Sequence, residues 1–521
     1  MFNTPAMLLA DFYKISHRKL YDRKEGIIYA TWTPRKSRIA GVEEIVVFGI
    51  QGFIRKYLID YFNENFFKKP VADIVKEYQR IIKNTLGEDK ADAEHIYQLH
   101  SLGYLPIKIE ALKEGTLCPI KCPCLTIQNT KPEFLWVTNF IETLFSMEVW
   151  KPMTSATIAW EYRKILEKWA EKTCDNRSHV DYQGHDFSMR GMGGLDSAMT
   201  SGAGHLISFK GTDTIPAICY LEQYYRADVE QEEIGTSIPA TEHSIMEFNS
   251  AGTEKDEFRA FHRILTEVHP SGTVSIVSDT WNLWKVLTNT LPRLSKTIKN
   301  RVGKLVIRPD SGDPCDIICG INTKTFFDPY RGIDKKVKLL TDADSEYYNE
   351  MNKGVVELLW DIFGGTVNKK GYRVLNPCVG VIYGDAITLE RAEEICERLA
   401  SKGFASSNIV FGIGSYTYNM NSRDTFGFAL KSTYAVKDGE EIFLYKKPIT
   451  DDGEKVSQKG MVAVLRDEAT KKLFYQDNLT YSEKYHSNIT PYDKLLTVFE
   501  NGVIKEYDSL SNIRFRLSLN R

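Results

Sequence analysis

The most regular pattern along the chain is a set of short, β-branched apolar runs that end in polar or glycine-rich residues. Four of them lie in the second half of the chain, at 273–279, 304–312, 379–385 and 408–415. Continuous apolar runs of this length are typical of strands covered on both faces, and helical sequence such as 388–404 lies between them. The alternation predicts parallel β-α units, arranged as a β/α barrel or as an open parallel sheet.

The N-terminal part of the chain has a mixed pattern. Strand-like runs at 26–34, 43–50, 107–112 and 124–130 are interspersed with amphipathic helices, of which 71–86 is an example. This mixture predicts an α+β arrangement rather than a continuation of the parallel units.

Beyond about Arg423 the pattern predicts β-hairpins. Asp438-Gly439 and Asn501-Gly502 each lie between two apolar runs, and both dipeptides favour two-residue turns. We therefore expect an irregular β/α barrel together with a mixed α+β domain formed by both chain ends. The predicted limits are 1–152 and 425–521 for the mixed domain and 153–424 for the barrel, with a surface insertion at about 320–350.

Composition and charge are those of an ordinary globular protein. The chain has 521 residues, of which 42% are hydrophobic and 26% charged, which suits a soluble protein of two or three domains. A formal net charge of -2 gives no general attraction to nucleic acid or to an anionic membrane, so any anion site must be a local cluster of cations. No apolar run approaches the roughly 20 residues of a membrane-spanning helix, and we expect no signal peptide at the N-terminus.

The nine cysteines have no regular spacing, which indicates reduced thiols and a cytoplasmic location. Cys118, Cys122 and Cys124 lie close together in sequence, but no histidine or fourth cysteine is near them. We interpret these three as buried small apolar residues rather than as a metal site.

Candidate chemistry is concentrated between Gly184 and Ser244, in the segments GHDFSMRG, FKGTD and SIPATEHS. Aromatic, cationic, carboxylate and imidazole groups stand there beside small residues, a combination that suits a flat heterocycle with an anionic partner. Each residue alone also has a structural interpretation. Asp213 can be a turn residue, Phe187 a core residue and His243 a satisfied structural histidine.

Polar residues also lie at the predicted ends of the parallel strands, where ligands bind both in barrels and in open sheets. They include Asp279, Arg308, Asp310 and Asp385. Arg308 and Asp310 can hold an anion and sugar hydroxyls, or can pair with each other to close the rim. The glycine-rich turn at 411–415 can cradle a phosphate or serve as a tight corner.

Four cations outside these strand ends are candidate partners for a polyanion. They are Arg35, Arg423, Lys431 and Lys446. The alternative for each of them alone is a solvated cation on the surface.

Eight segments taken together resemble the nicotinamide phosphoribosyltransferases of the nicotinate phosphoribosyltransferase family. They occur in the order and near the spacing of that family, and they extend from about Met7 to the C-terminal hairpins. The segments are LLADFYKISH, HDFSMRG, SFKGTDT, SIPATEHS, VSIVSDT, IRPDSGDP, VIYGDAI and FGIGS followed by SRD.

The resemblance implies a reaction and its substrates. A phosphoribosyl group passes from phosphoribosyl pyrophosphate to nicotinamide, which gives nicotinamide mononucleotide and pyrophosphate in NAD salvage. Mg²⁺ is the implied cofactor and ATP a co-substrate. The implied assembly is a homodimer with its active sites at the subunit interface.

The resemblance also implies roles for single residues. The nicotinamide ring stacks between Phe187 and a tyrosine of the second subunit that matches Tyr13, with Arg190 beside them. Asp213 accepts a hydrogen bond from the carboxamide, and it would repel the carboxylate of nicotinate. His243 matches a histidine that ATP phosphorylates.

The full set of implied site residues divides into two groups, with Mg²⁺ held mainly through substrate phosphates rather than by protein ligands. The catalytic group is Glu242, His243, Asp279, Arg308 and Asp310. The substrate-binding group is Asp11, Tyr13, Arg35, Phe187, Arg190, Asp213, Ser237, Ser275, Gly384, Asp385, Gly414, Ser415, Arg423, Lys431 and Lys446.

Three departures from the family pattern bear on phosphate and ATP contacts. Gly380 stands where the pattern has an arginine, the turn FGIGSY replaces a run of more glycines, and the insertion at 320–350 is extra. Two alternatives stay open, a nicotinate phosphoribosyltransferase, against which Asp213 argues, and a non-catalytic binding or signalling protein on the same scaffold.

Overall fold

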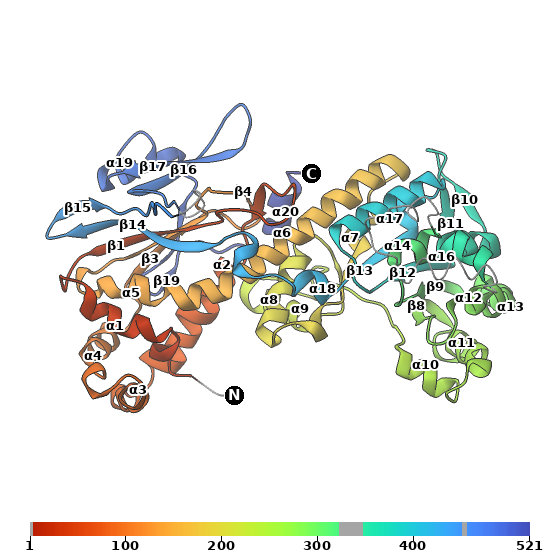
Figure 1. Ribbon diagram of the computed structural model, residues 1–521, viewed down its shortest axis with the longest axis horizontal. Helices are drawn as coiled ribbons and strands as arrows, with labels where there is room; N and C mark the ends of the chain where they lie inside the picture. The colour runs from red at the N-terminus through yellow and green to blue at the C-terminus, as the bar shows by residue number, and fades with distance from the viewer. Residues whose placement is uncertain (1–3, 322–346, 451–455) are drawn as a thin grey trace.

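The computed structural model describes residues 4–321, 347–450 and 456–521. It is elongated, with an antiparallel sheet at one end and a parallel sheet flanked by helices at the other (Figure 1). The long helix α6 (Glu142–Thr173) runs between the two. Most of the predicted insertion, residues 322–346, lies outside the described residues.

Both chain ends contribute to the antiparallel sheet. Its seven strands have the order β15-β14-β1-β5-β3-β18-β19, and each neighbouring pair is antiparallel. The predicted α+β domain from both ends of the chain is thus confirmed. The strands are β1 (Ile27–Thr33), β3 (Ile107–Ala111), β5 (Leu125–Asn129), β14 (Ala429–Lys437), β15 (Glu440–Phe443), β18 (Leu496–Glu500) and β19 (Val503–Ile504).

The predicted strand at 43–50 is shorter than expected. Strand β2 (Glu44–Val46) pairs with β4 (Leu117–Pro119), and helix α2 (Ile50–Phe53) follows. Gly49 precedes the helix at φ 95°, a left-handed conformation that suits glycine, and a Cβ there would lie 2.4 Å from Pro152 Cγ. This turn ends the extended chain before Ile50.

Both predicted hairpin turns are confirmed. Asp438 and Gly439 have φ of 54° and 83° between β14 and β15, and Asn501 and Gly502 have φ of 50° and 80° between β18 and β19. Positive φ at both central residues is the requirement of a type I′ turn, which Asp-Gly and Asn-Gly meet at low cost.

Helices and aromatic side chains cover this sheet. The predicted helix at 71–86 is α3 (Val71–Thr85), and α1 (Phe12–Leu20) and α4 (Glu94–Leu102) lie with it below the sheet in Figure 1. In the core, Trp32 stacks on Phe428 with ring centroids 5.3 Å apart and meets Phe145 edge-on at 5.0 Å. Cys118, Cys122 and Cys124 are buried in the same core, as interpreted from the sequence.

The second sheet is parallel and has the order β7-β6-β13-β12-β9-β8. The four strands predicted from the apolar runs are all present, and the helix predicted at 388–404 is α17 (Leu389–Ser401). The strands are β6 (Gly184–Asp186), β7 (Gly211–Thr212), β8 (Ser271–Val277), β9 (Val302–Arg308), β12 (Val379–Tyr383) and β13 (Ile409–Ile413).

A non-strand segment joins the two edges of this sheet. Thr236 bridges Gly211 of β7, and Ala240 bridges Ser275 of β8, both in parallel orientation. The bonds include Thr212 N–H to the Thr236 carbonyl at 3.0 Å and Ser275 N–H to the Pro239 carbonyl at 2.9 Å. The parallel sheet is thereby closed into a ring, which confirms the irregular β/α barrel.

The predicted boundary at 152/153 falls within α6, whose Pro152 is buried. The C-terminal helix α20 (Leu510–Ser518) packs Leu510 and Ile513 into one core cluster with Leu206 of α8 (Leu195–Leu206) and Leu221 of α9 (Ile215–Tyr225). The exact limits of the domains stay a prediction. Within the described residues, no helix is long and apolar enough to cross a membrane.

Candidate active site

An aromatic ring lies on the backbone of the parallel strand ends. Phe187 follows β6, and its N–H donates to the carbonyl of Ile413 at 3.0 Å. A Cβ on Gly412 would lie 2.4 Å from Phe187 Cδ2, and one on Gly384 would lie 3.0 Å from it. Only glycine at these two positions lets the ring approach the strand ends so closely.

A carboxylate, one of whose oxygens accepts no hydrogen bond in the described chain, contacts His185, whose ring neighbours that of Phe187. Asp213 follows β7, and its Oδ1 accepts hydrogen bonds from His185 Nε2 at 2.9 Å and from the Ser237 hydroxyl. No donor among the described residues reaches its Oδ2. Burial raises the pKa of Asp213, but the hydrogen bond and charge of His185, with Ser237 and Arg308, outweigh it and hold the pKa below the ordinary value. Asp213 is therefore ionised and able to accept one more hydrogen bond.

His185 is a site residue that the sequence reasoning missed. It is 8% exposed, and its ring centroid lies 4.8 Å from that of Phe187. Side chains two residues apart on a strand share a face, so the spacing of His185 and Phe187 around β6 was the available signal.

A buried layer fixes the turns that carry these groups. Asp186 accepts the Ser188 N–H and the Thr214 hydroxyl, and so ties together the turns after β6 and β7. His205 of α8 lies 2.7 Å from the Tyr418 hydroxyl and 2.9 Å from the Gly211 carbonyl. Burial lowers the pKa of His205, so the imidazole is neutral and bridges β7 and α18 (Ser415–Tyr418).

Arg308, Asp310 and Asp279 form a connected group at the ends of β8 and β9. Arg308 Nη1 lies 3.2 Å from Asp310 Oδ2, so the ion pair considered from the sequence is present. Arg308 Nη2 donates to the Thr241 carbonyl at 2.8 Å. Asp279 Oδ2 accepts the Asp310 N–H at 2.9 Å and the Ser311 hydroxyl at 2.6 Å. The two carboxylates are thus held in one fixed arrangement.

His243 faces Asp279 rather than Glu242. It begins α10 (His243–Asn249), with Nε2 3.9 Å from Asp279 Oδ1 and Nδ1 3.4 Å from the Thr280 hydroxyl. No hydrogen-bond donor reaches the buried Asp279 Oδ1 in the described chain. Glu242 is exposed, and its carboxylate accepts the Ser244 hydroxyl instead.

We term the ends of the parallel strands, with the residues that follow them, the rim. The remaining rim residues come from β8, β12 and β13. Ser275 is buried on β8, and no partner for its hydroxyl occurs among the described residues. The Tyr383 hydroxyl donates to the Gly312 carbonyl at 3.0 Å. Burial raises the pKa of Tyr383, and Asp385, Asp279 and Asp310 raise it further.

The turn after β13 packs against the turn that carries Arg190. Gly414 precedes α18, and a Cβ on Gly191 would lie 2.1 Å from the Ser415 hydroxyl oxygen. Arg190 itself is exposed at the mouth of the rim.

The other predicted residues lie around β1, β14 and α1, with Arg423 just before β14, at the end of the predicted barrel limits. Among them is a group that we term the cation cluster, comprising Arg35, Arg423, Lys431 and Lys446. Burial lowers the pKa of Lys431; Glu142 opposes this shift, while Arg35, Lys446 and Arg423 add to it.

Tyr13 is close to the cation cluster. It is 57% exposed on α1; burial raises its pKa, Glu142 and the adjacent Asp11 raise it further, and Arg423 lowers it. Asp11 accepts the Thr143 hydroxyl at 2.8 Å. The predicted residues thus form two groups, and in Figure 1 the elements that carry them lie in the two different domains.

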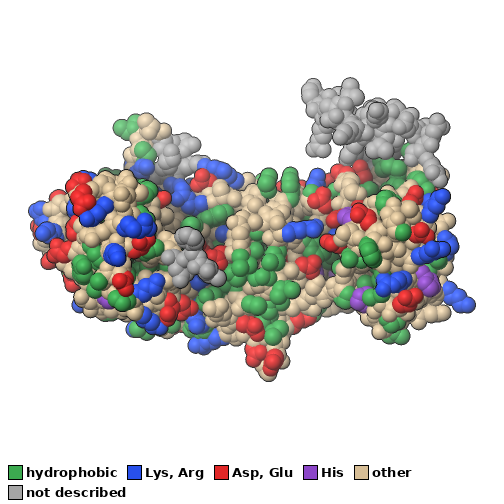
Figure 2. Space-filling model, turned by 90° about the horizontal axis from the view of Figure 1, so that it is seen from below, with side chains coloured by type: hydrophobic (Ala, Val, Ile, Leu, Met, Phe, Trp, Pro, Cys, Tyr) green, Lys and Arg blue, Asp and Glu red, His purple; other side chains and the backbone are tan. Residues whose placement is uncertain are grey.

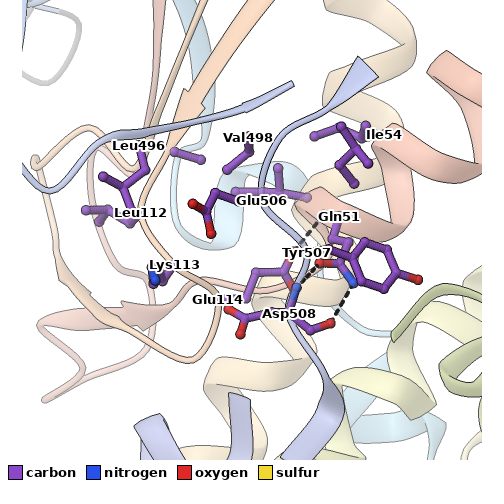
Figure 3. Close-up of a pocket in the computed structure, with 13 residues that line it drawn as sticks. Gln51, Ile54, Leu112, Lys113, Glu114, Leu496, Val498, Glu506, Tyr507 and Asp508 are labelled. Carbon is purple, nitrogen blue, oxygen red and sulfur yellow. Dashed lines mark hydrogen bonds between the residues drawn. The ribbon is translucent and has the colours of Figure 1, made fainter. Parts of the chain in front are cut away.

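A further hollow lies away from both groups, between α2, β3 and the segment before α20 (Figure 3). Its volume is about 30 Å³, which is room for one or two water molecules. Burial raises the pKa of Glu114 at its edge to about 7. Gln51 donates to the Asp508 carbonyl at 3.0 Å and binds Glu114 through its N–H at 2.7 Å. This hollow holds no predicted site residue and joins structural elements.

The sequence model of the nicotinate phosphoribosyltransferase (NAPRTase) family matches residues 182–502. The chain belongs to this family. The match covers the strand ends with Phe187, Asp213, His243 and Asp310, so the resemblance seen in the sequence is confirmed, as is an enzyme of the phosphoribosyltransferase class.

Curated relatives extend the match to nearly the whole chain. A nicotinamide phosphoribosyltransferase of Acinetobacter baylyi is 46% identical over 519 residues, which are 98% of this chain and 96% of that one. Proteins of the same name from Mycoplasma pneumoniae and Xanthomonas campestris are 34% and 32% identical and cover 85% and 98% of this chain, and 92% and 97% of their own.

A solved structure shares the fold. The crystal structure of a nicotinate-nucleotide pyrophosphorylase from Pyrococcus furiosus has a TM-score of 0.55 at 14% identity, over 99% of this chain and 95% of that chain.

We predict that Gly412→Ala displaces the Phe187 ring, because the added Cβ would lie 2.4 Å from Phe187 Cδ2. The loss of stacking, about 1 kcal/mol, corresponds to a fall of roughly fivefold in kcat/KM for the base substrate. Gly380→Ala on the neighbouring β12 is the control, since its nearest neighbour is the flexible Lys304 side chain at 3.2 Å. Equal kinetics for the two variants would contradict the role of the glycine.

Proposed function

We propose that this enzyme transfers the phosphoribosyl group of phosphoribosyl pyrophosphate to nicotinamide and couples the transfer to ATP hydrolysis through His243. The observation that carries the proposal is the ionised Asp213, whose Oδ2 is free to accept a hydrogen bond beside the Phe187 ring. The names of the relatives, all nicotinamide phosphoribosyltransferases, support the same substrate.

Charge explains the choice of base. The carboxamide N–H₂ of nicotinamide donates to Asp213 Oδ2, while the ring stacks on Phe187. Nicotinate would place a second carboxylate against Asp213 in a partly buried site, where like charges repel strongly. This argument favours nicotinamide over the nicotinate alternative.

Transfer requires stabilisation of a positive sugar and of a departing polyanion. As the C1′–oxygen bond to pyrophosphate breaks, the ring nitrogen of nicotinamide attacks C1′. The Oδ1 atom of Asp310 lies close to Gly384 and accepts hydrogen bonds from the ribose hydroxyls. The buried Nε of Arg308 has no hydrogen-bond partner among the described residues. Gly384, Asp385, Gly414 and Ser415 surround the sugar and its phosphate.

The leaving pyrophosphate needs several positive charges. The cation cluster supplies them; burial lowers the pKa of Lys431, and the neighbouring cations of the cluster lower it further. Mg²⁺ would add charge neutralisation when bound to the phosphates.

The surroundings of His243 support its phosphorylation. A ring nitrogen attacks the γ-phosphate of ATP, the bond to the bridging oxygen breaks, and ADP leaves. The Asp279 carboxylate, 3.9 Å from Nε2, favours the positive charge that develops on the imidazole. Glu242 lies at the same helix start and is exposed toward an incoming nucleotide.

A head-to-tail homodimer would complete the site. The rim carboxylates and the cation cluster lie in different domains, so one chain supplies each half to a different site. Apolar side chains exposed near the rim include Met189, Leu195, Ile215, Tyr416 and Met420. Figure 2 shows hydrophobic side chains gathered at the middle of one face, where α8 and α9 lie. A second subunit would cover such a surface.

The reaction is tested by incubating the protein with phosphoribosyl pyrophosphate, Mg²⁺ and either nicotinamide or nicotinate, with and without ATP. Nicotinamide mononucleotide should form, and ATP should increase its yield. Nicotinate mononucleotide as the main product would establish the nicotinate alternative. If neither mononucleotide forms, the result would support the alternative of a non-catalytic binding or signalling protein.

We predict that Asp213→Asn abolishes the preference for nicotinamide, because it removes the charge that repels nicotinate. The ratio of kcat/KM for the two bases should change by at least about tenfold. Asp228→Asn, on the exposed loop after α9, is the control. An unchanged ratio in Asp213→Asn would remove the basis for the assigned substrate.

Treatment with γ-labelled ATP should leave acid-labile, base-stable phosphate on the wild-type protein and none on His243→Ala. His262→Ala, which removes an exposed histidine of α11 (Glu257–Arg263), should label normally. Label that persists in His243→Ala would place the phosphorylated residue elsewhere.

The dimer predicts complementation between two inactive variants. Asp310→Ala damages the rim and Arg423→Ala the cation cluster, so each alone has two defective sites per dimer. Random mixing should restore about a quarter of wild-type activity, since half of the dimers are mixed and each has one intact site. Failure to recover activity, although subunit exchange is seen by mass spectrometry, would refute the shared site.

A further inference from the structure

The segment that closes the barrel contacts three parts of the site within a few residues. We define the closing segment as residues 236–243. Where we propose that the base binds, the Ser237 hydroxyl donates to Asp213. Where we propose that the sugar binds, the Thr241 carbonyl accepts a hydrogen bond from Arg308 Nη2 at 2.8 Å. Where we propose that phosphorylation occurs, His243 lies 3.9 Å from Asp279.

Thr241 is the residue that anchors this segment to β8. Its N–H donates to the Ser275 carbonyl at 3.0 Å, and its hydroxyl accepts the Val277 N–H at 3.0 Å. Val277 is the last residue of β8 and is fully buried. The Thr241 hydroxyl therefore satisfies a buried strand N–H that would otherwise lose its acceptor.

The hydrogen bonds between Thr241 and β8 also fix the chain before and after Thr241. Arg308 gains a fixed acceptor in the Thr241 carbonyl, which aims the guanidinium that also pairs with Asp310 at 3.2 Å. Two residues on, His243 begins α10 at the distance from Asp279 that the anchor sets. Asp279 in turn accepts the N–H of Asp310, so these contacts connect His243 to the carboxylate that we propose binds the sugar.

We propose that Thr241 is a positioning residue that couples phosphorylation of His243 to the use of phosphoribosyl pyrophosphate. A shift of His243 on phosphorylation is transmitted through two backbone steps to the Thr241 carbonyl, and so to Arg308 and Asp310. The inference rests on the proposed function and specifies how ATP acts on the transferase site.

The test compares Thr241→Val and Thr241→Ser in the full-length enzyme. Valine keeps the shape of threonine but removes the acceptor for the Val277 N–H, whereas serine restores it. Thr157→Val is the matched control, because the buried Thr157 hydroxyl accepts the N–H of Val46 of strand β2 at 2.9 Å, away from the closing segment. All variants are measured for thermal unfolding and for labelling by γ-labelled ATP.

The readout is the ratio of kcat/KM for phosphoribosyl pyrophosphate with and without ATP, together with ATP hydrolysed per mononucleotide formed. Thr241→Val should lower the ratio by about tenfold and raise futile ATP hydrolysis, while His243 is still labelled. Thr241→Ser and Thr157→Val should keep wild-type coupling, although Thr157→Val loses stability to a similar degree.

Three results would overturn the inference: wild-type coupling in Thr241→Val, loss of coupling in Thr157→Val as well, or no recovery in Thr241→Ser. If ATP has no effect on the wild type, the inference is also overturned. If the wild type still forms nicotinamide mononucleotide in that case, the proposed transfer reaction is unaffected. A wild type that forms no nicotinamide mononucleotide would instead refute the proposed function.

Discussion

Closure of the parallel sheet is the constraint on which the site depends. Strands β7 and β8 lie at opposite edges of the sheet, and residues 236–241 join them by single bridges. Because the ring is closed, Asp213 after β7 and Asp279 after β8 face one space. In an open sheet of the same order these residues would lie at opposite edges and could not share one site.

The second constraint is the separation of opposite charges. The rim carries Asp279, Asp310 and Asp385, whereas the cation cluster lies on the other domain. Asp310 pairs with Arg308 of its own strand end rather than with the cation cluster. Burial lowers the pKa of Lys431 and the neighbouring cations lower it further, so the charge of this side chain is unfavourable in the free protein.

The sequence predicted the fold well because its signals are local. The four apolar runs, the helix at 388–404 and the Asp438-Gly439 and Asn501-Gly502 turns follow from periodicity and turn chemistry. The closing segment could not be predicted in this way, since it pairs through isolated bridges and contains Pro239, which has no N–H for a ladder.

The candidate site was less accessible to sequence reasoning than the fold. The predicted strand ends were enough to place Arg308 and Asp310 together. Two other contacts depend on segments that are distant in sequence: His243 faces Asp279 instead of its neighbour Glu242, and His185 donates to Asp213.

The glycines beneath Phe187 have a consequence for ligand chemistry. On that side Gly384 and Gly412 present backbone and no side chain, and the Phe187 ring fills the space a Cβ would take. In the proposed binding mode, polar groups therefore meet the heterocycle only at its edge, at Asp213, while its face meets the Phe187 ring. Planar pyridines that keep the carboxamide fit this binding mode, whereas a substituent that projects from the plane of the heterocycle would meet the Phe187 ring.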